Sequence, residues 1–381
     1  MTIAQVSFWI LSGLVAYVYV GYPLLLVIVR AARGRRAVAA GDHEPPATLI
    51  ISAYNEESVI EGKLRASLAL DYPRENLEIV VVSDASTDRT DEIVQSFAAE
   101  GVKLLRMPQR GGKTLGLNAA VAQATGEIIV FSDANAIYDT QAVRLLARTF
   151  ADPEVGAAVG ESRYAPAANA ADKNESAYWK YECALKRLES DVGSVVGGDG
   201  AIFAIRKSCY EPMAADALSD FVTPLQIVRQ GYRCVYVPEA YSVEEGAGRF
   251  DKEWKRKVRI VNRAWRATMG LKGMLNPFAY GLFAVQLLSH KLLRWLMPGF
   301  LIGLLVASSV VAPLGGIYAL ALVLQLAFYA LAVIGFLRRR ELPFYLSVPY
   351  YFCLVNVASL TGIIESYLGK SYTTWTTARA E

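Results

Sequence analysis

The chain has an apolar start, a mixed middle and an apolar end. An uncharged apolar stretch runs from Val6 to Val29, and three more lie between Leu296 and Val311, Ile317 and Leu337, and Pro343 and Leu368. At about 1.5 Å per residue, roughly 20 apolar residues suffice to cross about 30 Å of hydrocarbon. The pattern therefore predicts one N-terminal and about three C-terminal transmembrane helices.

The basic residues around these stretches predict an orientation. Arg30, Arg33, Arg35 and Arg36 follow the first stretch, whereas a cleaved signal peptide carries its basic residues before the apolar run. Arg338–Arg340 separate the last two stretches. Because basic loops favour the cytoplasmic side, we expect an integral protein of the cytoplasmic (inner) membrane with its central segment in the cytoplasm.

A fifth stretch, Pro277–Trp295, is apolar but interrupted by His290, Lys291 and Arg294. This mixture predicts an amphipathic helix at the membrane interface, with a fifth span as the alternative. Polar residues such as Asn356 and Glu365 also interrupt the last stretch, so the side of the C-terminus stays open. The expected parts are an anchor at 1–36, a cytoplasmic domain at 37–272, an interfacial helix at 273–295 and a C-terminal membrane region at 296–381.

In the middle of the chain, short β-rich runs alternate with helical patterns. The runs "TLIISAY", "LEIVVVS", "VKLLRM" and "EIIVFS" are separated by segments of about a dozen residues with helical patterning. Nearly continuous apolar strands that alternate with helices predict an α/β domain with a mostly parallel sheet covered on both faces.

Polar residues stand where three of these strands end. Asn55 and Glu56 follow the first strand, Asp84 the second, and Asp133 and Asn135 the fourth. Any one of them could be a helix cap. Because ligands of open α/β sheets bind at the carboxyl ends of the strands, the three ends together predict a binding site.

The residue types at these ends indicate a phosphate ligand and a hard metal ion. The side-chain oxygens of Asp133 and Asn135 suit Mg²⁺ or Mn²⁺, which share their remaining positions with substrate phosphates. The segment "QRGGKTLGLN" adds a glycine-rich helix start and Lys113. The chain lacks the spacing of a Walker A motif and of a dinucleotide-binding GxGxxG motif.

Composition excludes several other classes. A net charge of +3 gives no basis for a nucleic-acid partner. The four cysteines are isolated, without a CxxC pair, and only two histidines are present. A zinc site, a disulfide framework and Ser-His-Asp chemistry are therefore not expected.

Taken in order, the motifs resemble those of the family 2 glycosyltransferases, which are inverting, metal-dependent enzymes with a GT-A fold. The resemblance rests on "SAYNEE", "VVVSDASTDRT", "GGKTLGLNAA", "FSDAN", "VGGDGAIFAIRK", "LSDFVTP" and the basic-aromatic segment ending at Trp265. It is nearest to the membrane-embedded branch that holds hyaluronan, cellulose, chitin-oligosaccharide and poly-N-acetylglucosamine synthases.

The resemblance implies roles for individual residues. Nucleotide-sugar binding would fall to Asn55, Glu56, Asp84, Lys113 and Asp133. Asp133 and Asn135 would hold the metal, and Asp220 in "LSDF" would be the catalytic base, although Asp220 could instead only cap a helix.

Three departures from the family pattern follow. Asn135 replaces the second acid of the family's DxD motif, which leaves the metal site one negative charge short. The QxxRW signature is absent as such; Trp265 is present, with Arg259 and Arg263 as displaced candidates for the diphosphate. Asp199 in "GGDG" stands where an uncharged residue is common and would face the acceptor. The basic segment fits anionic lipid headgroups as well as a diphosphate.

The expected function is transfer of a sugar from a UDP-sugar to a growing saccharide, with membrane lipids around the protein. Transfer of one sugar to a lipid-linked acceptor is the enzymatic alternative, and a non-catalytic nucleotide-binding scaffold is a third. With only four predicted spans, a complete export channel would need a homo-oligomer or an export partner.

Overall fold

The computed structural model describes residues 1–42, 44–164, 170–244, 250–338 and 342–374. These form two compact units, which we describe separately. The unit expected from the sequence to be catalytic, called the catalytic unit, comprises 33–166, 183–246 and 371–381, and the helical unit comprises 1–32, 167–182 and 247–370. Of the basic cluster expected at the membrane edge, Arg339 and Arg340 lie outside the described residues.

The catalytic unit is built on an eight-stranded sheet in the order β3-β2-β1-β4-β7-β6-β8-β5. Strands β3, β2, β1 and β4 are parallel to one another, and β7 and β5 run antiparallel to their neighbours. The strands are β1 (Ala47–Ala53), β2 (Leu77–Ser83), β3 (Val102–Arg106), β4 (Ile128–Asp133), β5 (Ile137–Tyr138), β6 (Val155–Tyr164), β7 (Ile202–Arg206) and β8 (Arg233–Glu244).

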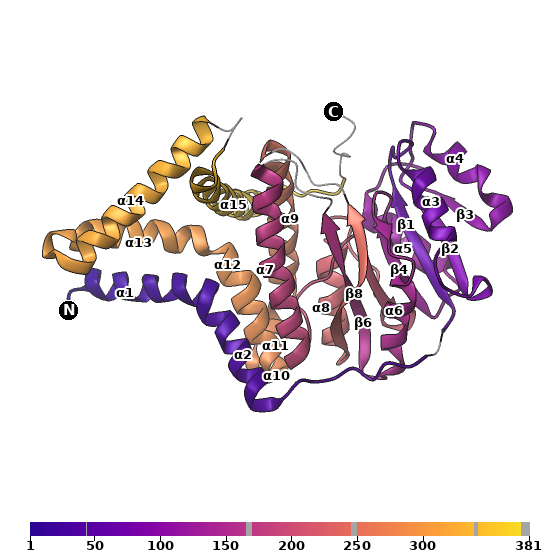
Figure 1. Ribbon diagram of the computed structural model, residues 1–381, viewed down its shortest axis with the longest axis horizontal. Coiled ribbons are helices and arrows are strands. Elements are labelled where there is room, and N and C mark those ends of the chain that lie inside the picture. The colour runs from indigo at the N-terminus through magenta and orange to yellow at the C-terminus, as the bar shows by residue number, and fades with distance from the viewer. Residues whose placement is uncertain (43, 165–169, 245–249, 339–341, 375–381) are drawn as a thin grey trace. The chain divides into compact units, whose positions relative to one another are not determined.

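Helices cover both faces of this sheet (Figure 1). Alternate residues of β2 enter separate cores: Ile79 and Val81 belong to the core that also contains residues of α3, α4 and α6, whereas Val80 and Val82 belong to the core with residues of α5 and α8. The helices are α3 (Ile60–Leu68), α4 (Thr90–Ser96), α5 (Lys113–Gln123), α6 (Ala142–Arg148) and α8 (Ser219–Arg229). Burial on both faces explains why β2 is a run of β-branched residues.

The strand directions bring several chain segments to one edge. The carboxyl ends of the parallel strands β1, β2 and β4 lie at the same edge, which is the edge with Asp84 and Asp133. Because β7 is antiparallel to β4, its start at Ile202, paired with Ser132, lies there too. The loop that precedes β7 therefore reaches the edge that the sequence predicts as a binding site.

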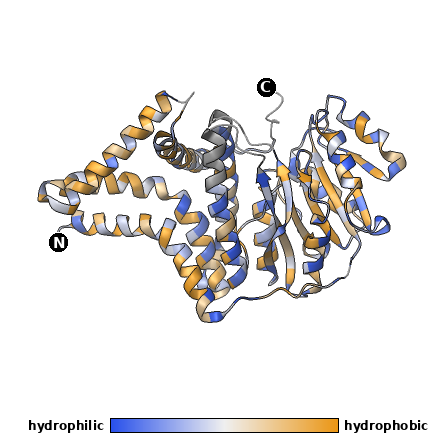
Figure 2. Cartoon of the chain, in the orientation of Figure 1, coloured by the Kyte–Doolittle hydropathy of each residue, from blue (hydrophilic) through white to orange (hydrophobic). Residues whose placement is uncertain are grey.

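The helical unit contains four helices that are long and apolar enough to cross a membrane, among the residues that the structure describes. The first consists of α1 (Ile3–Ala16) and α2 (Tyr22–Arg33), joined by a π-helical turn (Tyr17–Gly21). The second is α13 (Met297–Val311) with the turn after it. The third and fourth are α14 (Gly316–Leu337) and α15 (Phe344–Tyr367). Figure 2 shows hydrophobic residues spread along α1, α13 and α14.

The remaining helices of this unit are polar or mixed. They are the part of α7 (Ala170–Val192) before Cys183, the basic helix α9 (Phe250–Gly270) and the short helices α10 (Pro277–Tyr280), α11 (Leu282–Gln286) and α12 (Leu293–Trp295). A π-helical turn, Leu287–Leu292, joins α11 to α12. The predicted interfacial helix is thus helical, but Gly281 at φ +55° interrupts it.

The predicted α/β fold class and the order of strands and helices up to β4 are confirmed. The sheet is more mixed than its first half suggests, since β5 and β7 are antiparallel. Residues 80 to 83 of β2 are buried, and Asp84 follows them directly. The carboxylate therefore stands at the end of a buried strand, at the edge of the sheet where the sequence predicts a binding site.

Glu78 of β2 allows a test of how the sheet is held together. It accepts hydrogen bonds from Thr48 Oγ1 (2.6 Å), Lys103 Nζ (2.6 Å) and the Thr125 N–H (2.8 Å). Burial by itself would raise the pKa of Glu78, but these hydrogen bonds outweigh it and lower the pKa to about 2. The folded state therefore gains from the charged carboxylate above about pH 4.5, and this gain is lost as the pH falls towards about 2.

We expect Glu78→Gln to destabilise the purified protein by about 1–2 kcal/mol at pH 7, because the ion pair with Lys103 is lost and the hydrogen bonds from Thr48 and Thr125 become neutral ones. The difference from wild type should shrink between about pH 4.5 and 2, as followed by thermal unfolding with intrinsic fluorescence. Glu75→Gln, at an exposed position nearby, is the control. A difference that is independent of pH would contradict the assigned role of the charge.

Candidate active site

A buried carboxylate organises the glycine-rich loop. Asp84 is 2% exposed, and its two oxygens accept hydrogen bonds from the backbone N–H groups of Gly111 (2.7 Å) and Gly112 (2.9 Å). Gly112 has φ +90° and directly precedes α5. Only glycine adopts this conformation readily, so the sequence "GGK" follows from the turn that presents Lys113.

Lys113 joins the ends of two strands. Its Nζ donates to Asp133 Oδ1 at the end of β4 and to the carbonyl of Gly200 (3.0 Å), just before β7. Gly200 in turn packs on Asp220, because a Cβ atom built on Gly200 would lie 3.4 Å from Asp220 Oδ2. The structure thus brings together three of the residues predicted for the site: Lys113, Asp133 and Asp220.

The backbone of Asp220 is also fixed. Asp220 lies in the first turn of α8, and its carbonyl accepts a hydrogen bond from the Gly198 N–H (2.6 Å). A side chain at Gly198 would collide with this carbonyl, since a Cβ atom there would lie 2.7 Å from it. The glycines of "GGDG" therefore let the loop approach α8 closely and set where the Asp220 carboxylate stands.

Asn55 and Glu56 connect the ends of β1 and β2. Asn55 has φ +53°, a conformation that asparagine tolerates, and its Oδ1 accepts from the Thr87 N–H (2.8 Å). The Glu56 N–H donates to Thr90 Oγ1 (2.8 Å). These contacts hold the two loops side by side at the predicted edge.

Asp199 is held inside the protein. It is 6% exposed and accepts hydrogen bonds from Ser162 Oγ (2.7 Å) and from the Ser162 N–H (3.0 Å). Lys186 Nζ lies 3.9 Å from it. These contacts make Asp199 an anchor of the loop before β7. Its expected role towards the acceptor stays a prediction.

Two features near the site escaped the sequence analysis. Lys63 of α3 is fully buried, and its Nζ donates to the Ala136 carbonyl and lies 4.0 Å from the Tyr138 ring centroid. Burial lowers the pKa of Lys63 to about 7, although Asp133 acts in the opposite direction. The sequence signal for a buried lysine was its spacing: Lys63 lies on the same helix face as Ile60, Leu64 and Ser67, which are also buried.

The second feature is a contact between an arginine and a ring. The guanidinium of Arg110 lies 3.9 Å from the ring centroid of Tyr54, which follows β1. This contact joins the loop after β1 to the glycine-rich loop. No local sequence signal pairs the two residues, because 56 positions separate them.

The donor set at the end of β4 fits a hard divalent cation only in part. Asp133 supplies one carboxylate, with its side chain 36% exposed, and Asn135 is half-buried two residues later. No group of three or more His, Cys, Asp or Glu residues that could hold a metal occurs in the described part of the chain. A metal at Asp133 and Asn135 would therefore take its remaining ligands from water and phosphate oxygens.

The remaining predicted residues lie in the helical unit. Arg259, Arg263 and Trp265 are on α9, and Arg263 and Trp265 are buried. The ring of Trp265 packs edge-on against Trp295 (6.4 Å between centroids) and Tyr367 (6.2 Å). For Trp265 the structure thus records a packing role within this unit.

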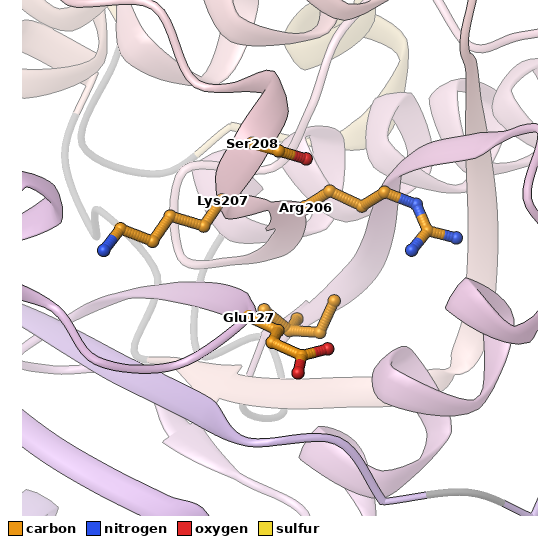
Figure 3. Close-up of a pocket in the computed structure, with 5 residues that line it drawn as sticks. Glu127, Arg206, Lys207 and Ser208 are labelled. Atoms are coloured by element: carbon orange, nitrogen blue, oxygen red, sulfur yellow. The ribbon is translucent and has the colours of Figure 1, made fainter.

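A separate hollow of about 440 Å³ lies at the opposite edge of the sheet. Glu127, Arg206, Lys207 and Ser208 line it, and Figure 3 shows the Arg206 and Lys207 side chains pointing in opposite directions. Arg206 donates to the carbonyls of Val155 and Asp152, and Lys207 to that of Ala124. Both side chains thus bind backbone carbonyls, and we assign no function to this hollow.

The sheet order and the polar residues at its carboxyl edge define a GT-A nucleotide-sugar transferase fold. Over 96% of this chain and 100% of the other, the structure is similar to that of the mannosyltransferase PcManGT from Pyrobaculum calidifontis, determined in complex with GDP-Man and Mn²⁺ (TM-score 0.75, 24% identity). Residues 48–211 match the family model Glycosyl transferase family 2. The chain therefore carries a family 2 glycosyltransferase domain.

Two curated relatives agree with this assignment. The chain is 30% identical to the probable glycosyltransferase YdaM of Bacillus subtilis (strain 168) over 230 residues. The aligned region covers 56% of this chain and 54% of the relative. The chain is 28% identical over 222 residues to a poly-beta-1,6-N-acetyl-D-glucosamine synthase of Staphylococcus aureus (strain COL), which covers 56% and 53%. The chain thus matches about half the length of these relatives.

We expect Asp84→Asn to weaken binding of a nucleoside diphosphate by about 10-fold to 100-fold. The amide has one acceptor oxygen and no charge, so one of the two glycine N–H groups loses its partner. Calorimetric titration with UDP measures the affinity, and hydrogen exchange at Gly111 and Gly112 should become faster. Asp42→Asn, which changes an exposed carboxylate, is the control. Unchanged affinity together with faster exchange would show that the loop does not contact the nucleotide.

Proposed function

We propose that the protein is an inverting, metal-dependent membrane glycosyltransferase that moves a sugar from a UDP-sugar to a growing saccharide. The observation that carries this proposal is the position of Lys113. Its ammonium group contacts Asp133 of the proposed metal motif and the carbonyl of Gly200, against which Asp220 packs. Lys113, a proposed donor-binding residue, and Asp220, the candidate base, thus both contact Gly200.

Asp220 would act as the catalytic base. Its carboxylate takes the proton of the acceptor hydroxyl while that oxygen attacks the anomeric carbon of the donor sugar. The bond between this carbon and the diphosphate oxygen breaks in the same displacement, so the configuration inverts and UDP leaves. The first turn of α8 and the Gly198 contact would hold the carboxylate in place for this step.

The leaving diphosphate would be received at the start of α5. The N-terminus of a helix favours anions, and Lys113 adds a positive charge there. Asn55, Glu56 and Asp84 would position the nucleoside side of the donor, Asp84 by holding Gly111 and Gly112. A Mg²⁺ or Mn²⁺ ion at Asp133 and Asn135 would stabilise the charge that develops on the diphosphate.

The acceptor is the least constrained part of the proposal. The name of the Staphylococcus relative favours a growing saccharide. A lipid-linked acceptor that receives a single sugar is the second candidate, and the four apolar helices favour it because they would keep such a lipid near the domain. Arg259, Arg263 and Trp265 of α9 would act on the acceptor side or on the diphosphate, and Asp199 would act by anchoring its loop.

We further propose that the domain lies in the cytoplasm and that the protein resides in the inner membrane. The support is the basic cluster at the end of the first apolar helix and directly after it, Arg30, Arg33, Arg35 and Arg36. UDP-sugars are made in the cytoplasm, so this orientation would place the domain where its donor is. An export partner or a second copy would be needed if the product is a polymer that crosses the membrane.

Release of UDP by the purified protein tests the reaction. With Mn²⁺ or Mg²⁺ and a panel of UDP-sugars plus GDP-mannose, we expect release from one UDP-sugar. Asp220→Asn should lower this turnover by about 10²-fold to 10⁴-fold, since a general base contributes about that much. Calorimetric affinity for UDP should change little.

Asp216→Asn provides the matched control, because it removes a carboxylate four residues earlier in the same segment. Gel filtration of the products distinguishes the two acceptors: long products require elongation, and a labelled lipid extract without them indicates single transfer. Full activity of Asp220→Asn would exclude Asp220 as the base. Release from GDP-mannose alone would overturn the choice of donor.

Asn135 yields a separate prediction about the metal. Asn135→Asp restores a second carboxylate to the proposed site, so half-maximal activity should need about 10-fold less Mg²⁺ or Mn²⁺. The comparison is made at saturating donor by titrating the metal from a chelated preparation. Asn118→Asp, which changes an asparagine on α5 that binds Tyr210 and Met213, controls for a general effect of added charge. An unchanged metal requirement would place the metal elsewhere.

A further inference from the structure

We infer that α15 does not cross the membrane but lies along the membrane surface on the side of the catalytic unit, so that the chain crosses three times. Of the four apolar helices, α15 is the last before the C-terminal segment. The inference does not depend on the proposed transferase activity. It rests on where the chain goes after α15, on what packs against α15, and on which residues α15 leaves exposed.

The segment after α15 belongs to the catalytic unit. Residues 371–374 group with the sheet and its helices. The carbonyl of Thr373 lies against Gly112, and a Cβ atom on Gly112 would collide with it. Since Gly112 precedes Lys113 at the start of α5, this segment is on the same side of the membrane as the nucleotide-binding loop.

Counting the crossings then limits α15. The chain leaves the catalytic unit, crosses with α13, returns with α14 and must end on the side from which it started. A further crossing by α15 would place Thr373 on the opposite side from Gly112. Only 11% of the most apolar part of α14 is buried, as expected of a helix surrounded by lipid, but 56% of that of α15 is.

If residues 277–295 also crossed the membrane, α15 could cross as well and Thr373 would still lie on the same side as Gly112. The contacts of this segment oppose such a crossing. His290 Nε2 lies 3.0 Å from Glu182 Oε2, and Arg294 donates to Glu182 Oε1. Glu182 lies on α7, which continues into the catalytic unit at Cys183. Both ends of 277–295 are therefore on the catalytic side, because its other end follows the charged helix α9.

The partner of α15 is a helix that cannot lie in hydrocarbon. Tyr351 Oη donates to Glu253 (3.3 Å), Asn262 Nδ2 donates to the Gly362 carbonyl (3.2 Å), and the rings of Trp265 and Tyr367 pack together. These contacts run from one end of α9 towards the other. Between them α9 carries many basic residues, namely Lys255, Arg256, Lys257, Arg259 and Arg263. Such a density of charge is too costly for the membrane interior.

The direction of α15 agrees with this. Figure 1 views α15 nearly along its axis, whereas α1 and α13 of the same unit run across the page. Contacts between α15 and α14 are recorded near the start of α15, such as those of Tyr350 with Phe336 and of Phe352 with Phe328. Beyond this region, Gly362 and Tyr367 contact α9, and α15 also contacts α12 and α13.

The exposed residues of α15 identify the bilayer as its other partner. In its second half, Val357 and Ile364 are exposed at helical spacing with Leu368, the residue that caps the helix, and the half-buried Leu360 lies between them. The opposite face buries Asn356, Ser359 and Gly362. A helix with its polar side on a basic helix and its apolar side outward fits the boundary between lipid tails and anionic headgroups.

Cysteine labelling tests the side on which the chain ends. Single substitutions Ala37→Cys, Leu314→Cys and Ser371→Cys are made in the full chain with Cys353→Ser, and all three positions are exposed. Intact cells are treated with a membrane-impermeant maleimide, before and after permeabilisation. We expect Ser371→Cys to be labelled like Ala37→Cys and opposite to Leu314→Cys. Labelling of Ser371→Cys together with Leu314→Cys would overturn the inference.

A depth measurement tests the orientation of the helix itself. Spin labels at Val357 and Leu368 in vesicles with anionic lipid should have the same ratio of oxygen to nickel accessibility. For a helix that crosses the membrane, a separation of 11 positions along the chain would change the depth by about 16 Å. Such a difference would overturn the inference even if the labelled side were as expected. Thermal unfolding of each variant shows whether it has folded.

Discussion

The site depends on one buried carboxylate, Asp84, that binds two backbone N–H groups. Asp84 ends a strand buried on both faces, and its oxygens receive the N–H groups of Gly111 and Gly112. A carboxylate removed from water is stable only when its oxygens are satisfied by hydrogen bonds, and two amide donors at the start of a helix provide them. The left-handed turn at Gly112 follows from this arrangement, and so does the position of Lys113.

Lys113 then sets the balance of charge at the sheet edge. Its ammonium group pairs with Asp133 while Asp220 stands on the other side of Gly200. A divalent cation and an ammonium group cannot occupy the same side of one carboxylate oxygen. If a metal binds Oδ1 of Asp133, Lys113 must move away from that oxygen, and a diphosphate that binds at the start of α5 offers it a new partner. Asn135 in place of an acid makes this exchange depend more strongly on the diphosphate, because the protein alone provides a single negative charge.

Local sequence was enough to place the strands and the ends where the site residues lie. Apolar runs such as "LEIVVVS" are long and clear, and the carboxyl ends of parallel strands must share an edge. What each residue contacts was not predictable, because the partners are distant in sequence. Asp84 contacts a loop 27 residues later and Asp199 binds Ser162, while their expected roles towards the nucleoside and the acceptor stay predictions. Lys63 was overlooked because a lysine in a helix is usually taken to be exposed.

The membrane helices illustrate the same limit at a larger scale. A hydropathy window counts the apolar residues of a segment, and by that measure α15 qualifies as a span alongside α14. The count does not register that Asn356 and Ser359 of α15 are buried or that Glu253 and Asn262 of α9 bind it. A helix that packs on a basic neighbour needs an apolar outer face if lipid lies on its other side, so a surface helix and a span can have the same composition. What separates them is the identity of the neighbouring helix and the side on which the next residues of the chain are found.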